Sequence, residues 1–462
     1  MTREDLYVDD DERGGMLRTR RDVLVATAGA AGIAGLAGCS GGGDGGDGAA
    51  TEDPNTPMEG PANVPVEGDS VTIGVAVPET GVYSGEGEDL KAGYQLAVQN
   101  INEGTGVVGT SHSALDGEGI TDKRVNLVVE NTDSSGEEAG DVARNLVTSN
   151  DAVMVTGGAS PTEAHAIIDV ADDLEFMYML GFVPGTTVTG ERCSRYAFQA
   201  MFNAKMAAQA LALELKAAFG TGVNFLQIQP NSDLGDSFAE SMSEEMSAEA
   251  SWHQVNTIQT RIGTQSYESA LEEAVDIGPD VLVLNYYGLD GANVLSQAQG
   301  ILPDDMNVVV PLFDRPMAAS AGGAIEDVLG TVQWEKDITE PLSRAFNQAW
   351  MNASMGDQTA TPEPSGLAHL AYFQLLQYAE AVERAGSFHP DYVIPQLEDH
   401  EYAVGMGTHT FRACDHQSIR PVPVVRGLSK KRQYPGTYFE RTGITRDIGY
   451  GCDETPAGDC SL

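Results

Sequence analysis

Hydroxyl, aromatic and small residues gather in four segments, each of which directly follows a short apolar run. Backbone N–H groups, hydroxyls, aromatic rings and a single carboxylate are the groups with which proteins hold a small polar solute reversibly. The sequence therefore favours non-covalent binding over bond-making chemistry. The candidate ligand-binding residues, in chain order, are Tyr83, Ser84, Ala159, Ser160, Phe182, Thr186, Tyr287 and Asp314.

The segment Gly157-Gly158-Ala159-Ser160-Pro161 has the most specific pattern of the four. Ser160 is of a type favoured at the N-cap, and Pro161 suits the first position of a helix. A helix start offers free N–H groups and the positive end of the helix dipole, which together attract a carboxylate. The alternative is that Ser160 only caps its helix.

The other three segments carry weaker signals. Tyr83 lies in a polar, glycine-rich stretch that would equally suit a plain turn. Phe182 and Thr186 lie in a loop whose simpler interpretation is a surface connection. Tyr287 has a core position as its alternative, and Asp314, which precedes an arginine, has an ion pair as its alternative.

Motifs of the common hydrolases and nucleotide-binding enzymes are absent from the sequence. It contains no HExxH, no G-x-S-x-G and no G-x-x-x-x-G-K-[ST], and its eight histidines are scattered. Cys414 beside Asp415 and His416 would allow a thiol dyad, but a structural cysteine is the simpler interpretation. We therefore predict no catalytic residue, no cofactor and no metal site.

Short apolar runs alternate with segments of helical periodicity. The expected strands cover residues 71–77, 125–129, 152–156, 176–180, 224–229, 281–285 and 308–311, and the expected helices cover residues 90–101, 137–148, 162–172, 236–250, 267–275, 293–299, 342–355 and 367–385. A further long helix has Met206, Ala210, Leu213 and Ala217 as its expected apolar stripe. Short apolar strands separated by helices are typical of parallel sheets covered on both faces. The predicted fold class is α/β, with two doubly wound, Rossmann-like lobes.

Acidic residues outnumber basic ones, with 69 Asp and Glu against 26 Lys and Arg, which gives a formal net charge of −43. Such a chain cannot neutralise phosphates, so we exclude nucleic acid as a partner. Because concentrated salt screens self-repulsion, we interpret the excess acid as adaptation to a saline medium. The alternative is a cation-binding surface.

Export and anchoring signals stand at the N-terminus. Arg20 and Arg21 precede an apolar run over residues 23–37, and the tetrapeptide Leu-Ala-Gly-Cys ends at Cys39. The first pattern resembles a twin-arginine export signal and the second a lipoprotein cleavage box whose cysteine carries the lipid. The run is short for a membrane span, and an uncleaved signal anchor is the alternative. Residues 40–68, rich in Gly, Asp and Pro, predict a flexible tether.

The cysteine count fits an exported protein. If Cys39 is lipidated, four cysteines remain, and four can pair completely in an oxidising exterior. None has the CxxC or His-rich spacing of a metal site. The expected location is the outer face of the cytoplasmic membrane.

Several motifs carry a resemblance to a known family. Residues 73–81 read IGVAVPETG and residues 97–102 read AVQNIN. Further motifs, in order, are GAS at 158–160, DLG at 233–235 and YYG at 286–288. Over residues 70 to 425 the chain thus resembles the leucine/isoleucine/valine-type substrate-binding proteins of ABC transporters, with the type I periplasmic binding fold, and its acidity and export signal resemble those of haloarchaeal lipoproteins.

In this family two α/β lobes enclose the ligand between them. The resemblance implies that Ser160 and residues 182–186 hold the α-carboxylate of an amino acid, that Asp314 holds the α-ammonium and that Tyr287 is an aromatic contact. Leu234 departs from the Tyr that is common there. The same fold also serves amides, urea and other small organic molecules. A branched-chain or other amino acid is therefore the expected solute, with an amide or urea as the alternative.

The resemblance also implies a domain organisation. Crossings between the lobes are expected near residues 197–199, 332–336 and 404–411. Because crossings are neighbours in this fold, Cys193 is expected to pair with Cys414, which leaves Cys452 for Cys460. The predicted divisions are a signal peptide at 1–38, a tether at 39–68, lobe 1 at 69–198 and 336–402, lobe 2 at 199–335 and 403–440, and a tail at 441–462.

The predicted function is that of a lipid-anchored, monomeric solute-binding component of an ABC importer. The ligand would favour the closed form by contacting both lobes, and membrane permease subunits would recognise that form. Membrane contact is expected through the lipid anchor only. The alternatives are a sensor that reports the ligand to a signalling partner and an exported hydrolase with an unrecognised site.

Overall fold

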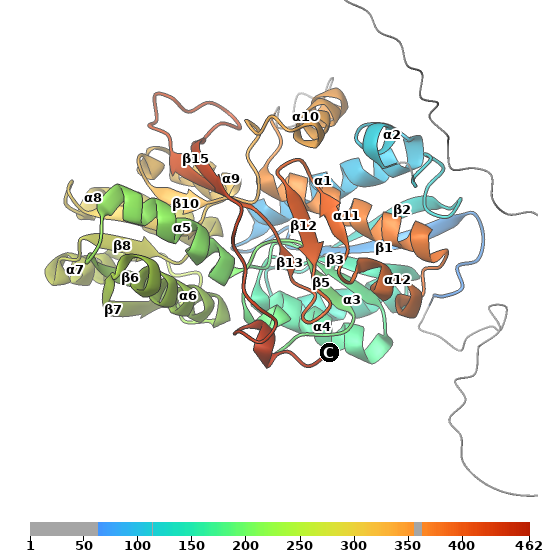
Figure 1. Ribbon diagram of the computed structural model, residues 1–462, viewed down its shortest axis with the longest axis horizontal. Helices are drawn as coiled ribbons and strands as arrows, with labels where there is room; N and C mark the ends of the chain where they lie inside the picture. Colours follow the sequence, from blue (N-terminus) through green and yellow to red (C-terminus); the bar gives the residue numbers. More distant parts are fainter. Residues whose placement is uncertain (1–62, 113, 355–362) are drawn as a thin grey trace, which may run out of the picture. The chain divides into compact units, whose positions relative to one another are not determined.

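Five parallel strands form the first sheet, in the order β2-β1-β3-β4-β5 (Figure 1). The computed structural model describes residues 63–112, 114–354 and 363–462. We call this sheet and the helices packed on it lobe 1. Its elements up to the first crossing are β1 (Ser70–Val77), α1 (Ser84–Glu103), α2 (Val108–Ser111), β2 (Arg124–Asn131), α3 (Gly136–Thr148), β3 (Ala152–Gly157), α4 (Pro161–Leu174), β4 (Met177–Leu180), η1 (Thr187–Thr189) and β5 (Ala197–Gln199).

Small residues let helices pack closely in lobe 1. A Cβ at Gly74 of β1 would lie 3.0 Å from the Leu146 side chain of α3. A Cβ at Gly93 of α1 would lie 2.3 Å from the carbonyl oxygen of Ala368 on α11 (Gly366–Ala385). The late helix α11 therefore lies beside the early helix α1 and belongs to lobe 1 (Figure 1).

Seven strands form the second sheet, in the order β15-β14-β10-β9-β8-β6-β7, which we call lobe 2 together with its helices. The pairs among β6 to β10 are parallel, while β14 and β15 are antiparallel additions. The elements are α5 (Ala204–Phe219), β6 (Asn224–Pro230), α6 (Asp233–Ala250), β7 (His253–Thr260), α7 (Glu268–Ile277), β8 (Val281–Leu284), α8 (Gly288–Ile301), β9 (Asn307–Leu312), α9 (Arg315–Ala321), η2 (Gly322–Ile325), β10 (Leu329–Thr331), β14 (Val422–Gly427) and β15 (Phe439–Thr445). The predicted α/β class with two Rossmann-like lobes is confirmed.

The apolar stripe expected on α5 is wrong at its C-terminal end. Leu213 is 52% exposed and Ala217 is also exposed, although Met206 is buried as expected. The buried face continues instead through Leu211 and Leu215. Because alanines fill much of this helix, the sequence offers two stripes of similar apolar character.

A three-stranded antiparallel sheet lies on the route of the third crossing. The remaining elements are α10 (Pro341–Ser354), α12 (Pro390–Leu397), β11 (Glu401–Ala403), β12 (Thr408–Phe411), β13 (Ser418–Ile419) and η3 (Ala457–Asp459). Residues 408–411, within the expected crossing, pair with β11 and β13, so the chain joins the second sheet later, at β14. Likewise β15 continues to Thr445, past the expected start of the tail at 441. The other lobe boundaries stay predictions.

The segments that connect the lobes contact one another. The Gln199 N–H donates to the His416 carbonyl oxygen at 3.0 Å. The guanidinium of Arg420 donates to the carbonyl oxygen of Ala200 at 3.2 Å and to the side-chain and backbone oxygens of Gln333 at 3.0 and 2.6 Å. One buried cation therefore touches the first and second crossings from its place on the third.

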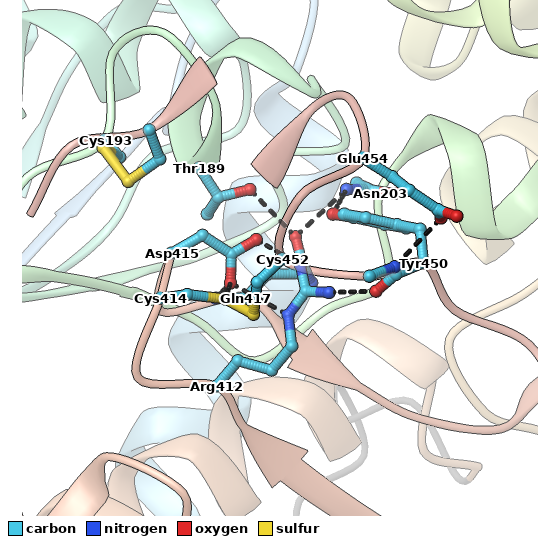
Figure 2. A network of polar contacts seen from close by, with 12 residues as sticks. Thr189, Cys193, Asn203, Arg412, Cys414, Asp415, Gln417, Tyr450, Cys452 and Glu454 are labelled. Atoms are coloured by element: carbon cyan, nitrogen blue, oxygen red, sulfur yellow. Dashed lines mark hydrogen bonds and ion pairs between the residues drawn. A yellow bond between two sulfur atoms is a disulfide. The ribbon is translucent and has the colours of Figure 1, made fainter. Parts of the chain in front are cut away.

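The predicted disulfide pairing is wrong, although all four predicted cysteines form disulfides. Cys193 pairs with Cys460, and Cys414 pairs with Cys452 (Figure 2). The chain that follows β15 reaches the third crossing first and lobe 1 last, so its two cysteines meet these partners in that order. Because Cys414 is oxidised in a disulfide, the thiol-dyad alternative is wrong as well.

Polar contacts fix this C-terminal segment, residues 446–462, which we call the strap. Arg412 forms an ion pair with Asp415 and also donates to the Tyr450 carbonyl oxygen. Asn203 donates to the Tyr450 hydroxyl at 2.6 Å and to Gln417 Oε1 at 3.3 Å (Figure 2). We call the three crossings, together with residues 412–420 that continue the third, the hinge. The strap is thus tied to the hinge both covalently and by hydrogen bonds.

The expected signal peptide, Cys39 and most of the expected tether lie outside the described residues. Of the helices that the structure does describe, none combines the length and apolar character needed to cross a membrane.

Candidate ligand-binding site

Loops from both lobes meet at the carboxyl ends of their parallel strands, where ligands bind in open α/β sheets. The Tyr83 ring after β1 stacks on the Tyr287 ring after β8, with centroids 4.9 Å apart. The Phe182 ring after β4 meets the Tyr287 ring edge-on at 5.3 Å. The Tyr287 hydroxyl donates to the carbonyl oxygen of Ala159, which follows β3. The structure thus brings four of the predicted residues together, and all four are buried.

The loop that carries Tyr83 is anchored to its neighbour. The Tyr83 N–H donates to the Ser134 hydroxyl oxygen at 3.1 Å, and that hydroxyl donates to the Thr80 carbonyl oxygen at 2.9 Å. Burial, and after it the Asp290 carboxylate, raises the pKa of Tyr83, so its phenol stays neutral. Ser84 is half-buried and begins α1 directly after this residue.

Ser160 is the N-cap of α4, as predicted, but its partner is Glu163, in a variant of the capping box in which the Glu163 carboxyl accepts the Ala159 N–H and the Ser160 hydroxyl. The Glu163 N–H donates to Ser160 Oγ at 3.2 Å, and the Ser160 hydroxyl donates back to Glu163 Oε2 at 2.9 Å. The same oxygen accepts the Ala159 N–H at 3.1 Å, and Oε1 accepts the Thr132 hydroxyl. Glu163 is fully buried, and this burial raises its pKa. The donors expected to hold a ligand carboxylate therefore already hold a carboxylate of the chain.

A glycine allows this helix start to approach the sheet. Gly157 has a φ of 124°, and a Cβ there would lie 2.0 Å from the Ala76 carbonyl oxygen. Any side chain at this position would therefore displace the loop that carries Ala159 and Ser160.

Thr186 contacts the opposite lobe through α6. Its N–H and its hydroxyl both donate to the Ser237 hydroxyl oxygen, at 3.2 and 3.1 Å. The loop after β4 thus contributes Phe182 to the ring cluster and Thr186 to a separate contact between the lobes.

Asp314 caps α9 and faces Glu86 of α1. Its Oδ1 accepts the Met317 N–H at 2.7 Å. Burial raises the pKa of Asp314 to about 6. Burial, and after it the charge of Asp314, raises the pKa of Glu86 well above its usual range. The two facing carboxyl groups therefore share one proton near neutral pH.

Arg315 pairs with Asp89 of α1 and not with the adjacent Asp314. Its Nη2 contacts Asp89 Oδ1, and its Nε donates to Asp89 Oδ2 at 3.2 Å. Its Nη1 donates to the Glu363 carbonyl oxygen at 2.8 Å. The ion pair considered for Asp314 thus forms with another acid and links the two lobes.

Sequence reasoning missed Glu86, Asp89, Glu163 and Ser237. Glu163 did have a signal, because a serine followed three residues later by glutamate is the pattern of a capping box. The other three carry no comparable signal, since the chain has 69 acidic residues and serines within helices are common.

No three His, Cys, Asp or Glu side chains in the described part of the chain are placed to hold a metal ion. The chemistry available at the site consists of hydrogen bonds, aromatic contacts and carboxyl groups. That combination suits reversible capture of a small molecule.

Comparisons with known proteins place this geometry in context. A family model described as "Periplasmic binding protein" matches residues 70–432. Among curated proteins, none matches the sequence. A solved amino acid ABC transporter substrate-binding protein from Pseudomonas fluorescens Pf-5 is similar to 86% of this chain over 100% of its own, at 18% identity and a TM-score of 0.73.

Two further solved structures have the same fold. A leucine-binding protein from Thermotoga maritima MSB8 covers 82% of this chain and 99% of its own, at 18% identity and a TM-score of 0.67. A solute-binding protein of an ABC transporter from R. palustris, in complex with benzoate, covers 85% of this chain and 100% of its own, at 15% identity and a TM-score of 0.70. At these identities the likeness establishes a shared fold.

Proposed function

The chain belongs to the family of periplasmic binding proteins, and from that membership we propose that it is the extracytoplasmic solute-binding component of an ABC importer. The observation that carries the proposal is the contact of Tyr83 and Phe182 from lobe 1 with Tyr287 from lobe 2. A site made of rings from both lobes is complete only when the lobes are closed. A solute that contacts both lobes therefore stabilises the closed form by its differential affinity for it.

The solute in this proposal is a small polar organic molecule. The sequence-based expectation is a branched-chain or other amino acid, with an amide or urea as the alternative. Two proteins of the same fold are named for leucine and for a complex with benzoate, and both of these molecules are small and polar, like the proposed solute. The proposed ligand-binding residues are Tyr83, Ser84, Ala159, Ser160, Phe182, Thr186, Tyr287 and Asp314.

Export and anchoring complete the proposal. A twin-arginine signal would export the chain, and a lipid on Cys39 would hold the monomer at the outer face of the cytoplasmic membrane. Residues 40–68 would be a flexible tether that holds the body off the membrane and lets it reach the permease. The two disulfides support an oxidising location. The net charge of −43 supports a saline medium and a haloarchaeal type of lipoprotein.

Calorimetry on the full exported chain in concentrated salt tests the binding role. Amino acids, amides, urea and short peptides are titrated, and one class is expected to bind saturably and to be recovered unchanged. Tyr287→Ala should weaken that binding by at least about tenfold, since aromatic anchors are typical hot spots. Tyr434→Ala is the control, because Tyr434 is 58% exposed on lobe 2. Chemical turnover of the solute would favour the hydrolase alternative.

Uptake measurements test delivery to a permease. Deletion of the gene should abolish uptake of the solute identified by calorimetry, and re-expression of the full chain should restore it. Uptake that is unchanged in the deletion strain, with loss of a solute-dependent response, would identify a sensor instead.

A further inference from the structure

The buried surface between the lobes carries an excess of negative charge. Acids from both lobes lie around Arg315, and this arginine is already paired with one of them, Asp89. Lys91 of α1 and Lys336 of the second crossing pair with other acids, Glu79 and Glu363. The acids of this cluster, which we call the cleft acids, are Glu86, Asp89, Glu163, Asp290 and Asp314, and each of them is at most 5% exposed.

The cleft acids differ in the number of hydrogen-bond donors and cations that contact their carboxyl oxygens. Asp89 has its arginine, and Asp290 accepts the Gly263 N–H at 2.8 Å. Glu163 has two donors at the start of α4 and a third, the Thr132 hydroxyl, directly after β2. Glu86 and Asp314 are different. Glu86 Oε1 and Asp314 Oδ2 are buried, and apart from the proton that the pair shares, no donor among the described residues reaches them. Buried carboxylate oxygens without donors are costly unless a cation or a proton offsets their charge.

Aromatic rings stand beside this acid pair. A Cβ at Gly288, the residue after Tyr287, would lie 3.0 Å from the Tyr83 ring and 3.4 Å from Glu86 Oε2. The Tyr83 ring, which stacks on the Tyr287 ring, and the Glu86 carboxyl group are therefore neighbours. A carboxylate beside aromatic rings is an arrangement that attracts organic ammonium groups, through charge pairing and cation–π contact together.

The opposite side of the same ring cluster disfavours an anion. The helix start at Ser160 would normally attract a carboxylate. Here Glu163 occupies the Ser160 hydroxyl and the Ala159 N–H, so a ligand carboxylate would lose these donors and lie against a buried carboxyl group. A second carboxylate beside this carboxyl group, in a poorly hydrated site, would be repelled whenever both groups are ionised.

We propose that the solute is a small organic cation, a primary or quaternary amine without a carboxylate, whose ammonium group lies between the Tyr83 and Tyr287 rings and the Glu86–Asp314 pair. This inference rests on the proposed solute-binding function, keeps its small polar organic solute, and replaces the expected amino acid, amide or urea by an organic cation. The cation supplies the charge that the unpaired carboxyl oxygens lack. Its arrival ionises the pair, and the shared proton passes to the solvent.

Matched solutes test the inference on the full exported chain by calorimetry. 3-Methylbutylamine is compared with leucine, and benzylamine with benzoate, so that each pair differs by its carboxylate or its charge. We expect the amines to bind at least about tenfold more tightly, which corresponds to ~1.4 kcal/mol. Binding of the amines should also release a proton, measured as a dependence of the heat on the ionisation enthalpy of the buffer.

Two variants separate the roles of the acids. Glu86→Gln should weaken amine binding by at least about tenfold and remove the proton release, whereas Glu88→Gln, an exposed change on the same helix, should do neither. Glu163→Gln should improve binding of leucine and benzoate, and its control is Glu138→Gln at the equivalent, exposed position of α3. Circular dichroism and thermal unfolding show whether each variant is folded.

The outcomes distinguish this inference from the proposed function. Tight binding of leucine or benzoate to the unaltered chain, with no preference for the amines, overturns the cationic substrate class and leaves the solute-binding function standing. Equal amine binding by Glu86→Gln and the unaltered chain overturns the role of the acid pair. Failure of every solute in both panels to bind overturns the inference together with the function on which it rests.

Discussion

The hinge and the cleft both contain buried charged groups between the lobes, but the groups differ in sign and in their hydrogen-bond partners. At the hinge, Arg420 has no carboxylate partner among the described residues, yet it donates to backbone and side-chain oxygens of Ala200 and Gln333. Two buried donors there, Arg420 Nε and Gln333 Nε2, have no partner in the described part of the chain. At the cleft the unpartnered atoms are acceptors, because Glu86 and Asp314 each keep a carboxyl oxygen that no donor reaches apart from the proton that the pair shares. The charge of the hinge cation is therefore met by oxygens of the chain, whereas the cleft is left with negative charge that a bound cation can satisfy.

The largest expected effect is at the hinge. Arg420→Met should lower the free energy of unfolding by about 3–5 kcal/mol, because it leaves buried oxygens on two crossings without their charged donor. Burial lowers the pKa of Arg420 to about 10, so the side chain is still charged at neutral pH. Denaturant unfolding of the full chain in concentrated salt measures the change.

The control for Arg420→Met is Arg426→Met on β14. The Arg426 side chain is 41% exposed, and its contact with Asp327 spans 3.8 Å. Its loss should cost less than about 1 kcal/mol, as for other exposed ion pairs. Similar losses in the two variants would show that Arg420 does not hold the crossings together.

The disulfide between the strap and the third crossing should have the next largest effect. Replacing Cys414 and Cys452 together by serine opens a loop with a sequence separation of 38 residues, which should cost about 2–4 kcal/mol. Solute affinity, measured on the folded variant, should stay within about threefold, since the strap lies at the hinge. A large loss of affinity at unchanged stability would place the strap in the binding site and contradict the contrast between hinge and cleft.

The acid pair at the cleft should make stability depend on pH. In the unfolded chain Asp314 loses its proton near its ordinary pKa of about 4, whereas the folded chain keeps it until about pH 6. The folded state thus binds more protons between these values, and the free energy of unfolding falls as pH rises through them. Burial, and after it Asp337, raises the pKa of Glu335 to about 7. Glu335 therefore also lowers the free energy of unfolding as pH rises towards 7.

Unfolding of the solute-free chain should therefore be about 1–3 kcal/mol easier at pH 7.5 than at pH 4.5. Glu86→Gln should reduce this difference, because it removes a carboxyl group whose own pKa is raised well above its usual range by burial and by Asp314. Glu88→Gln should leave the difference as it is, since Glu88 is exposed. A stability that rises with pH over this range would contradict the shared proton.

Regular elements could be predicted from the sequence where apolar residues repeat, and they could not where burial is one-sided. The strands that became β1, β3 and β8 read as apolar runs because both faces of each are covered. The strand β7 (His253–Thr260) was not predicted. It is an edge strand paired only with β6, and Ile258 is its single buried side chain. A half-exposed strand of polar residues gives no apolar signal.

The site could be predicted one residue at a time but not as a set of contacts. The N-cap role of Ser160 is a local property, so Ser160 and Pro161 identified the start of α4. The partners of buried charges depend on which loops face each other across the lobes. Asp89 and Arg315 are 226 positions apart, and spacing carries no information about such a pair. The disulfides follow the path of the strap and could not be paired for the same reason.

The smallest expected effect is the loss of one hydroxyl at the cleft. Tyr287→Phe removes the hydrogen bond to the Ala159 carbonyl oxygen but keeps the ring contacts, and it should cost about 0.5–1.5 kcal/mol. Tyr286→Phe is the control, since its hydroxyl contacts Thr260 within lobe 2 at 2.8 Å. Both variants should unfold slightly more easily. Only Tyr287→Phe should increase the radius of gyration of the solute-free chain in solution scattering, because its bond joins the lobes and the other does not. Equal scattering from the two variants would mean that the closed form does not depend on this bond, and the other contacts between the lobes, with the hinge, would then set the angle between them.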